Sequence, residues 1–396
     1  MDEVLQLIGR DTELFGEDLH KYEHEIRSVL QGARILVVGG AGSVGRAVVK
    51  ELFKREPKVL HVVDMSENSL VELVRDLRSS IGYISGEFKT YCLDCGSVEF
   101  EAFFDAQSRY DYVLNFSALK HVRNEKDPFT LMRMINVNIV NAEKLLSMAA
   151  DRKVSKYFCV STDKATNPVN MMGASKRIME MFLMRASQSI PISSSRFANV
   201  AFSDGSLLDG FNYRLRKRQP FSAPDDVKRY FITERESGIL CLLSTFLGEN
   251  RDILFPKLSP KLHLRTFSRI AVDYLTRLGY VPHICESEED ARNQMAELYA
   301  KKHWPCYFFT SDTTGEKDFE EFYSEQETVI WDKFQDIGVI KMKLDYDDDK
   351  LAAFLEAIDR LVKRKHWEKK NLVELFDQML DNFTHKETLK YLDDRM

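Results

Sequence analysis

The sequence predicts an α/β protein organised around a Rossmann-type, doubly wound parallel sheet. Short apolar segments of strand length alternate with helical patterns between residue 33 and about residue 200. This alternation is typical of parallel sheets whose strands are connected by helices. A glycine-rich turn follows the first apolar segment, and an aspartate ends the second. Strand ends of this kind carry the ligand site in doubly wound sheets.

We expect four parts along the chain. Residues 1–31 are predicted to form an N-terminal helical arm, and residues 32–200 an NAD-binding Rossmann domain. The strand–helix alternation ends near residue 200, so residues 201–345 are predicted to be a smaller, mainly substrate-binding α/β region. Residues 346–396 are amphipathic and predict a C-terminal helical extension that serves packing or oligomer formation. A homo-oligomer is therefore expected.

Composition limits the classes of function. The chain has 396 residues, of which 44% are hydrophobic and 30% charged, and its net charge is -6. This balance is ordinary for a soluble protein and gives no reason to expect nucleic acid as a partner. The N-terminus is acidic where a signal peptide is basic, and no apolar run reaches the roughly 20 residues of a membrane span. We therefore expect a cytoplasmic protein without a membrane partner.

The six cysteines are scattered, and two of them, Cys92 and Cys95, form a lone C-x-x-C. No second pair or nearby histidine completes a ligand set. We interpret the pair as strand-end packing, and no metal is expected.

The first strand, turn, helix and second strand lie in "ARILVVGGAGSVGRAVVKELFKREPKVLHVVD". Glycines three residues apart permit a tight turn and let the helix N-terminus face a pyrophosphate. Asp64 ends the second strand about 20 residues later, where an acid binds the adenosine ribose and repels a 2'-phosphate. NAD is therefore favoured, although Arg75 and Arg78 keep NADP as an alternative. A plain structural turn is the other interpretation. The cofactor-binding residues predicted here are Gly39, Gly42, Ser43, Val44, Gly45, Asp64, Ser66 and Asn68.

Further short strands are predicted in "FKTYCLD", "YDYVLNFSA", "KYFCVST" and "ISSSRFANV". Asp94 ends the first of these and is expected at the adenine edge. Ser117 and Ala118 form a small-residue turn after the second, where the dinucleotide must pass close to backbone. Lys120 and His121 follow on the same turn and are predicted to bind substrate, with a solvated loop as the alternative.

The stretch "VSTDKATNPVNMMGASKR" raises the question of where the chemistry lies. Short-chain dehydrogenases usually carry Tyr-x-x-x-Lys at the start of a helix. Here Lys176 stands at the lysine, but Met172 stands at the tyrosine, and a thioether is neither an acid nor a base. Asp163 and Lys164 follow the strand "KYFCV" and offer an adjacent acid–base pair at the carboxyl edge of the sheet.

These motifs, together with "RFANVAFSDGSLL", "KRYFIT" and "TTGEKDFEEF", resemble the extended short-chain dehydrogenases/reductases that act on nucleotide-linked sugars. The sequence most resembles the NDP-N-acetylglucosamine 4,6-dehydratases, in the branch with Met-Gly-Ala-Ser/Thr-Lys. The resemblance covers roughly residues 33 to 325. Its C-terminal motif and its length are similar to those of the enzymes that feed legionaminic-type nonulosonic acid synthesis. The nucleotide, uridine or guanosine, stays open, as does the C5 configuration of the product.

The resemblance implies oxidation at C4 of the sugar, loss of water across C5 and C6, and reduction at C6, with NAD regenerated in each turnover. Lys164 would remove the C5 proton, which requires its pKa to fall by about three units from about 10.4. Asp163 would take the C4 hydroxyl proton and later protonate the leaving C6 hydroxyl. Thr162 would bind the C4 oxygen, and Lys176 would hold the nicotinamide ribose. Met172 would mark the branch of the family.

The resemblance also implies substrate contacts. The positions that match the family are Asn199, Ser206, Arg229 and Glu316, with Lys317 beside the last. The sequence departs from the family at Asn141, where glycine is common. Two alternatives stay open: an NDP-sugar epimerase of the same fold, and a non-catalytic NAD(H)-binding regulator. Epimerases keep the tyrosine and lack the Asp-Lys pair.

Overall fold

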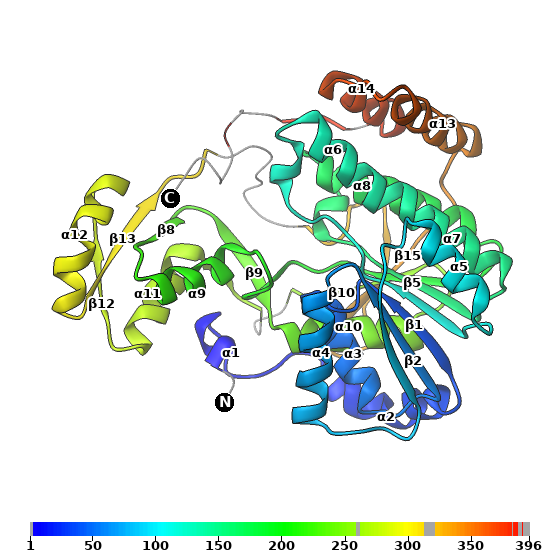
Figure 1. Ribbon diagram of the computed structural model, residues 1–396, viewed down its shortest axis with the longest axis horizontal. Helices are drawn as coiled ribbons and strands as arrows, with labels where there is room; N and C mark the ends of the chain where they lie inside the picture. The colour runs from blue at the N-terminus through cyan, green and yellow to red at the C-terminus, as the bar shows by residue number, and fades with distance from the viewer. Residues whose placement is uncertain (1–2, 259–261, 313–320, 382, 387–389, 391–396) are drawn as a thin grey trace.

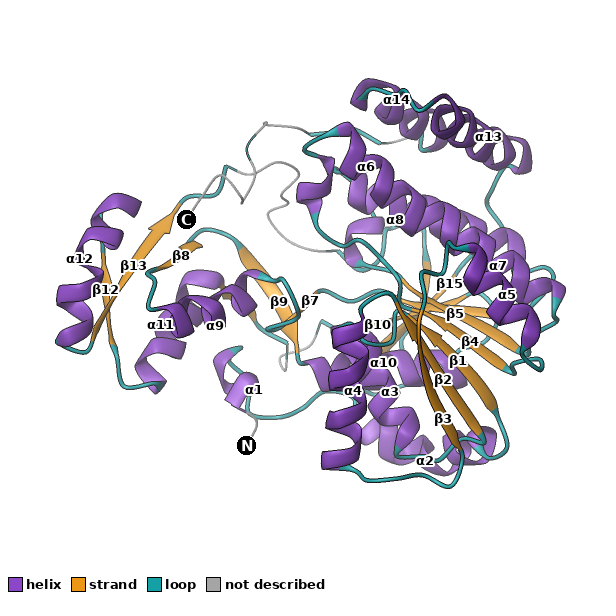
Figure 2. Ribbon diagram, viewed as in Figure 1, coloured by secondary structure: helices purple, strands orange, loops and turns teal. Residues whose placement is uncertain are grey.

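The computed structural model describes residues 3–258, 262–312, 321–381, 383–386 and 390. A sheet of nine strands forms the centre of this part of the chain, in the order β14-β15-β10-β6-β5-β4-β1-β2-β3 (Figure 2). The strands from β10 to β3 pair in parallel, and β15 is antiparallel to both of its neighbours. The order 3-2-1-4-5-6 is that of a Rossmann fold, so the predicted fold class is confirmed. The strands are β1 (Arg34–Val38), β2 (Val59–Asp64), β3 (Glu87–Cys92), β4 (Tyr112–Asn115), β5 (Lys156–Val160), β6 (Ile192–Ser195), β10 (Asp252–Pro256), β14 (Thr328–Ile330) and β15 (Ile337–Lys341).

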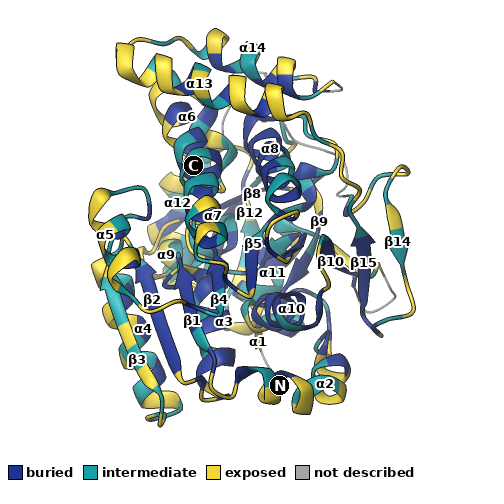
Figure 3. Cartoon of the chain, turned by 90° about the vertical axis from the view of Figure 1, so that its right-hand side faces the viewer, coloured by how far each residue is buried: buried dark blue, intermediate teal, exposed yellow. Residues whose placement is uncertain are grey.

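Helices cover both faces of this sheet, which explains why its central strands are apolar without alternation (Figure 3). In β1, Ile35 and Val37 pack on one helical layer, and Leu36 and Val38 on the other. The first layer contains α2 (Gly16–Leu30), α3 (Ser43–Phe53), α4 (Glu67–Ser80) and α10 (Glu234–Leu247). The second contains α5 (Val98–Ala106), α7 (Asn141–Asp151) and α8 (Met171–Ala186), with α6 (Pro128–Ile135) preceding α7.

A smaller lobe lies beside the carboxyl ends of the central strands (Figure 1). Its first sheet contains β7 (Asn199–Val200), β9 (Lys228–Ile232) and β11 (Leu264–Thr266), and its second contains β8 (Phe221–Pro224), β12 (Val281–Ile284) and β13 (His303–Phe309). Helices α9 (Leu207–Lys217), α11 (Phe267–Arg277) and α12 (Glu288–Ala300) complete it. The predicted strand "ISSSRFANV" is divided between β6 and β7, because the chain leaves the large sheet at Arg196. Since α10, β10, β14 and β15 return to the large sheet, residues 201–345 contribute to both lobes.

The N-terminal and C-terminal helices pack against the lobes described above. Leu5 and Ile8, in and just after α1 (Glu3–Leu7), are buried in the small lobe, whereas Ile26 of α2 is buried against the large sheet. At the other end, α13 (Asp348–Arg364) and α14 (Lys369–Met379) share one apolar core with α6 and α8 (Figure 1). The C-terminal extension is thus a packing element within its own chain. In the part that the structure describes, no helix is long and apolar enough to span a bilayer.

Candidate active site

The glycine turn lies at the carboxyl end of β1, and glycine is favoured for different reasons at Gly39, Gly42 and Gly45. Gly39 adopts a φ of 72°, and a Cβ there would lie 2.5 Å from the backbone nitrogen of Ser117. A Cβ on Gly45 would lie 2.2 Å from the Gly39 carbonyl oxygen, so this glycine lets α3 approach the turn. A Cβ on Gly42, at the N-cap of α3, would meet only one atom, 3.9 Å away. Packing therefore explains Gly39 and Gly45, while Gly42 leaves room for a ligand at the helix N-terminus.

Asp64 ends β2 and binds the glycine turn. Its carboxylate accepts hydrogen bonds from the backbone nitrogens of Ala41 and Ser66, both at 3.0 Å. Ser66 in turn caps α4 by accepting from Ser69, and Asn68 is exposed in the first turn of that helix. Asp64 itself is only partly buried, so it can fix the turn and still accept a hydrogen bond from a ribose hydroxyl.

The turn after β4 runs against the glycine turn. Asn115 accepts a hydrogen bond from the Ser117 nitrogen at 3.0 Å, and the Ser117 hydroxyl lies 3.7 Å from the buried Cys95 sulfur. Asp94 is paired with Arg133 of α6 at 3.2 Å. This ion pair is partly exposed, and the place of Asp94 at the adenine edge stays a prediction.

The Thr162–Lys164 segment follows β5 directly and turns into a short 3-10 helix, Asp163–Ala165. The Thr162 hydroxyl donates to Asp163 Oδ1 at 2.6 Å, and Lys164 Nζ lies 3.3 Å from the same oxygen. The side chain of Asp163 is 1% exposed, whereas that of Lys164 is 28% exposed. Asp163 and Lys164 thus form an ion pair in which the lysine is the more accessible member, and their acid–base roles stay a prediction.

Helix α8 lies directly against this turn. A Cβ on Gly173 would lie 2.4 Å from the Lys164 carbonyl oxygen, so the glycine permits the close approach. Asn170 caps the helix by accepting from the Gly173 nitrogen at 2.8 Å. Lys176 Nζ donates to the Val160 carbonyl oxygen at 3.1 Å, at the end of β5, and burial lowers the pKa of this amine.

Met172 is 4% exposed and belongs to the apolar core shared by α6, α8, α13 and α14. Because its contacts are those of a packing residue, Met172→Leu should keep most of the activity and lower stability by less than about 1.5 kcal/mol. Steady-state kinetics and thermal unfolding check this. A thousandfold loss of kcat with intact cofactor binding would assign the thioether a role that packing does not explain.

The residues predicted to bind substrate are spread over several segments of the chain. Lys120 Nζ donates to the Ser203 hydroxyl at 3.2 Å, and His121 lies against Gly205. Ser206 caps α9, so its hydroxyl already accepts from the Asp209 nitrogen. The other predicted positions are Asn199, half-buried in β7, Arg229, buried in β9, and Glu316 and Lys317, which lie outside the described residues.

Asp204, which the sequence pattern does not distinguish, joins these segments to the glycine turn. Its carboxylate accepts from the Ser43 hydroxyl at 2.8 Å, and Ser43 accepts from the Asp204 nitrogen. Arg46 of α3 pairs with Asp204 at 3.3 Å and also with Glu234. Ser43, predicted to bind cofactor, therefore also holds the loop that leads to Ser206.

Two buried groups behind the site were also missed. Asn138, in a π-helical turn (Asn136–Val140), accepts from the Leu119 nitrogen and donates to Ser175 of α8 at 3.0 Å. Arg196 binds Glu180 through two nitrogens, at 2.9 and 2.7 Å, and Glu180 also accepts from Ser161, which directly precedes the Thr162–Lys164 segment. Asn138 and Glu180 are polar residues within largely apolar helical segments, whereas Arg196 opens the motif "RFANVAFSDGSLL", where its partner could not be recognised from the sequence.

Asn141, the departure from the family pattern, has a local explanation. A Cβ on Gly96 would lie 2.4 Å from its amide nitrogen, so Asn141 is accommodated because residue 96 is glycine.

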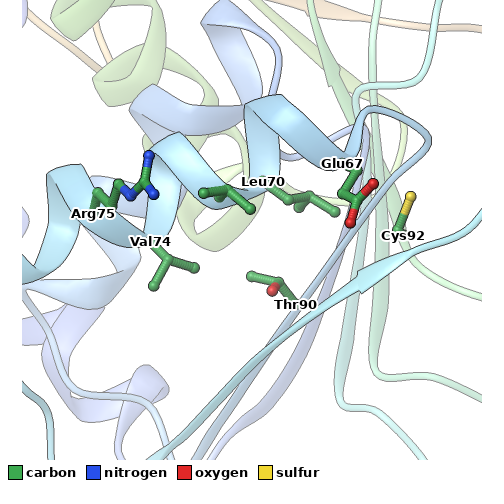
Figure 4. Close-up of a pocket in the computed structure, with 7 residues that line it drawn as sticks. Glu67, Leu70, Val74, Arg75, Thr90 and Cys92 are labelled. Atoms are coloured by element: carbon green, nitrogen blue, oxygen red, sulfur yellow. The ribbon is translucent and has the colours of Figure 1, made fainter.

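A pocket of about 360 Å³ lies between α4 and the edge strand β3, and it contains none of the predicted site residues (Figure 4). Arg75 lines it, two helical turns from Glu67, which is about 12 Å along the axis. Arg78 packs against Tyr83, with its guanidinium 4.1 Å from the ring centroid. Both arginines thus belong to the part of α4 remote from Asp64.

The strand order, the glycine turn and the lysine of α8 define an extended short-chain dehydrogenase/reductase fold. The chain belongs to the polysaccharide biosynthesis protein family, whose model matches residues 35–342.

Curated relatives cover most of the chain. A Methanocaldococcus jannaschii protein described as an uncharacterized membrane protein is 28% identical over 324 residues, 80% of this chain and 88% of the relative. A UDP-glucose 4-epimerase of Rickettsia massiliae is 25% identical over 317 residues, 78% of this chain and 82% of the relative.

Solved structures share the fold. Pen from Bacillus thuringiensis has a TM-score of 0.64 at 20% identity and covers 80% of this chain and 89% of its own. DesIV, a dTDP-glucose 4,6-dehydratase from Streptomyces venezuelae with NAD and TYD bound, has a TM-score of 0.55 at 16% identity and covers 73% and 88%.

Proposed function

We propose that this protein is an NAD-dependent 4,6-dehydratase of a nucleotide-linked N-acetylglucosamine, serving legionaminic-type nonulosonic acid or surface glycan biosynthesis. The observation that carries the proposal is the Thr162–Asp163–Lys164 arrangement at the end of β5, in a chain whose tyrosine position holds a buried methionine. Family membership and the relatives named above support a nucleotide-sugar enzyme of the dehydratase or epimerase type. The acid–base pair favours the dehydratase.

The glycine turn and Asp64 fit a dinucleotide, and Lys176, at the family's lysine position, is proposed to bind the nicotinamide ribose. When bound, the nicotinamide would supply the oxidation at C4 and the reduction at C6. The NADP alternative loses support because Asp64 is followed by Met65, Ser66 and Glu67, and no arginine of α4 lies beside it. A 2'-phosphate there would meet carboxylates without a matching cation.

The protein's own groups would move the protons. Thr162 donates to Asp163, so its oxygen can accept from the C4 hydroxyl and relay the proton to the buried carboxylate. Lys164 is the accessible base for the C5 proton, which the C4 ketone has acidified. Asp163 then returns its proton to the leaving C6 hydroxyl. Protonated Lys164 would return a proton to C5 as C6 is reduced, so Asp163 and Lys164 would both end the turnover in their starting states.

The deciding experiment incubates the purified protein with UDP- and GDP-N-acetylglucosamine and follows product mass. A dehydratase product is lighter by one water, an epimerase product has the mass of the substrate, and a regulator gives no product. A product of unchanged mass would show that the protein is an epimerase and not a dehydratase.

Asp64 is expected to select NAD over NADP. Asp64→Asn keeps an acceptor for the Ala41 nitrogen but removes the charge, so it should relax discrimination against the 2'-phosphate by about tenfold or more. Asp64→Ala should also weaken NAD binding, because the glycine turn loses its support. Binding titrations with both dinucleotides measure this. A wild-type preference for NADP would contradict the assignment.

A further inference from the structure

Glu125 is a fully buried acid that has no part in the chemistry proposed above. It ends a 3-10 turn, Val122–Glu125, in the segment that follows the β4 turn. Its Oε2 accepts from the backbone nitrogen of Met171, the first residue of α8, at 3.0 Å. That amide has no partner within its own helix, and a negative charge at a helix N-terminus is favourable. Glu125 therefore fixes where α8 begins.

The start of α8 is in direct contact with the Thr162–Lys164 turn. Gly173 touches the Lys164 carbonyl, and Asn170, 3% exposed, caps the same turn of the helix. A shift of Met171 would move this contact surface. The position of Lys164 thus depends on the position of the α8 N-terminus.

A second group, from the far end of the chain, completes the arrangement. His385 Nε2 lies 2.8 Å from the same Glu125 oxygen, and the next residue, Lys386, donates its backbone nitrogen to the Val169 carbonyl oxygen at 3.0 Å. Phe383 anchors this segment in the core shared with α13 and α14. The C-terminal segment thereby contacts both Glu125 and the loop between Lys164 and α8.

We propose that Glu125 and His385 are positioning residues of the active site: the C-terminal segment, through His385, holds Glu125 on the first amide of α8 and so holds the Thr162–Lys164 turn in place. The effect on kcat rests on the proposed function, because it assumes that this turn performs the dehydration. The geometric part concerns the order of residues 160–177 and can be measured without any substrate.

The experiment uses the full-length protein and three variants. His385→Leu removes the donor, and His385→Gln places an amide nitrogen near the position of Nε2. His366→Leu is the matched control, since His366 is an exposed histidine of the same extension. Amide hydrogen exchange is measured on peptides covering residues 160–177, and kcat and KM are measured with the nucleotide sugar that the wild type turns over. Thermal unfolding shows that each variant is folded.

His385→Leu should accelerate exchange in residues 160–177 and lower kcat by about ten- to a hundredfold with little change in KM, because a small displacement of a catalytic group costs that much. His385→Gln should restore both, and His366→Leu should match the wild type. Unchanged exchange in His385→Leu overturns the proposal, as does faster exchange with an unchanged kcat.

Should His385→Leu fail to fold, His385→Asn, which is polar but too short to reach Glu125, is assessed by the same criteria. If the wild type turns over no nucleotide sugar, the proposed function fails, and the exchange result alone then supports or overturns the positioning role.

Discussion

Lys164→Ala should arrest the reaction after oxidation at C4. The 4-keto sugar forms, but its C5 proton has no acceptor, so overall kcat falls by about 10²–10⁴. In a single turnover with the purified variant, the near-ultraviolet absorbance of the reduced nicotinamide should rise and persist. Exchange of the C5 hydrogen with deuterated solvent should disappear. Exchange at the wild-type rate would show that Lys164 is not the base.

Lys164→Arg is the matched variant for this experiment. An arginine keeps the positive charge beside Asp163, but it is never neutral near pH 7 and cannot accept a proton. If Lys164 acts as a base, Arg should fail as completely as Ala. Substantial rescue by Arg would instead assign Lys164 an electrostatic role.

Asp163→Asn should fail at an earlier step. The carboxylate accepts from Thr162 and is almost fully buried, so its loss removes the acceptor of the C4 hydroxyl proton. The same single turnover should therefore show a weak absorbance change or none. A strong, persistent signal in Asp163→Asn would show that the roles assigned to Asp163 and Lys164 are reversed.

The sequence predicted the central sheet because most of its first strands, such as β1 and β2, are short apolar segments with helical patterns between them. It did not predict the division of "ISSSRFANV". Ser193, Ser194 and Ser195 read as a polar segment, yet all three are buried in β6. Their hydroxyls bond to groups on neighbouring elements, for example Ser194 to the Cys159 carbonyl oxygen at 2.6 Å. Such partners are far away in the sequence, so the pattern alone could not show them.

The candidate site was predictable where its residues form contiguous motifs, as with the glycine turn and the Thr162–Lys164 segment. The assigned roles of those residues stay predictions. Groups whose partners are distant were missed, since Glu125 and His385 are 260 positions apart. Asp204 was missed because its structural role depends on a hydrogen bond from Ser43, which lies in another element. Sequence spacing carries local geometry, whereas these contacts depend on the tertiary fold.

Glu180 and Arg196 form an ion pair with both side chains fully buried, and it joins α8 to the chain as it leaves β6. Burial opposes ionisation of Glu180, but the Arg196 guanidinium outweighs it and lowers the pKa of Glu180 to about 2. In the unfolded chain the pKa is about 4.5. The stabilisation from this ionised carboxylate is therefore complete above about pH 4.5 and is lost as the pH falls towards 2.

Arg196→Met should lower the free energy of unfolding by about 3–5 kcal/mol, because it leaves the buried Glu180 without its main partner. Urea unfolding at neutral pH measures the loss. Arg177→Met is the control: Arg177 pairs with the same acid at 3.1 Å but is 31% exposed, so its removal should cost no more than about 1 kcal/mol. If the free energy of unfolding falls equally in the two variants, breaking the buried Glu180–Arg196 pair costs no more than breaking a partly exposed one, and the prediction is wrong.

The double variant Glu180→Met/Arg196→Met should recover part of that loss, since it removes the buried carboxylate of Glu180 together with its partner. Glu327, which pairs with Arg196 at 2.9 Å, keeps Arg177 at 4.0 Å as its ion-pair partner among the described residues, so the recovery should not be complete. The unfolding free energy of the double variant should also depend less on pH below about pH 4.5, where the wild type loses the contribution of Glu180. Ser161, which precedes the Thr162–Lys164 turn, would lose its acceptor in this variant. The activity of the double variant should therefore stay below that of the wild type even where its stability recovers. A double variant as unstable as Arg196→Met alone would show that the unpaired Glu180 carboxylate is not what destabilises the single variant.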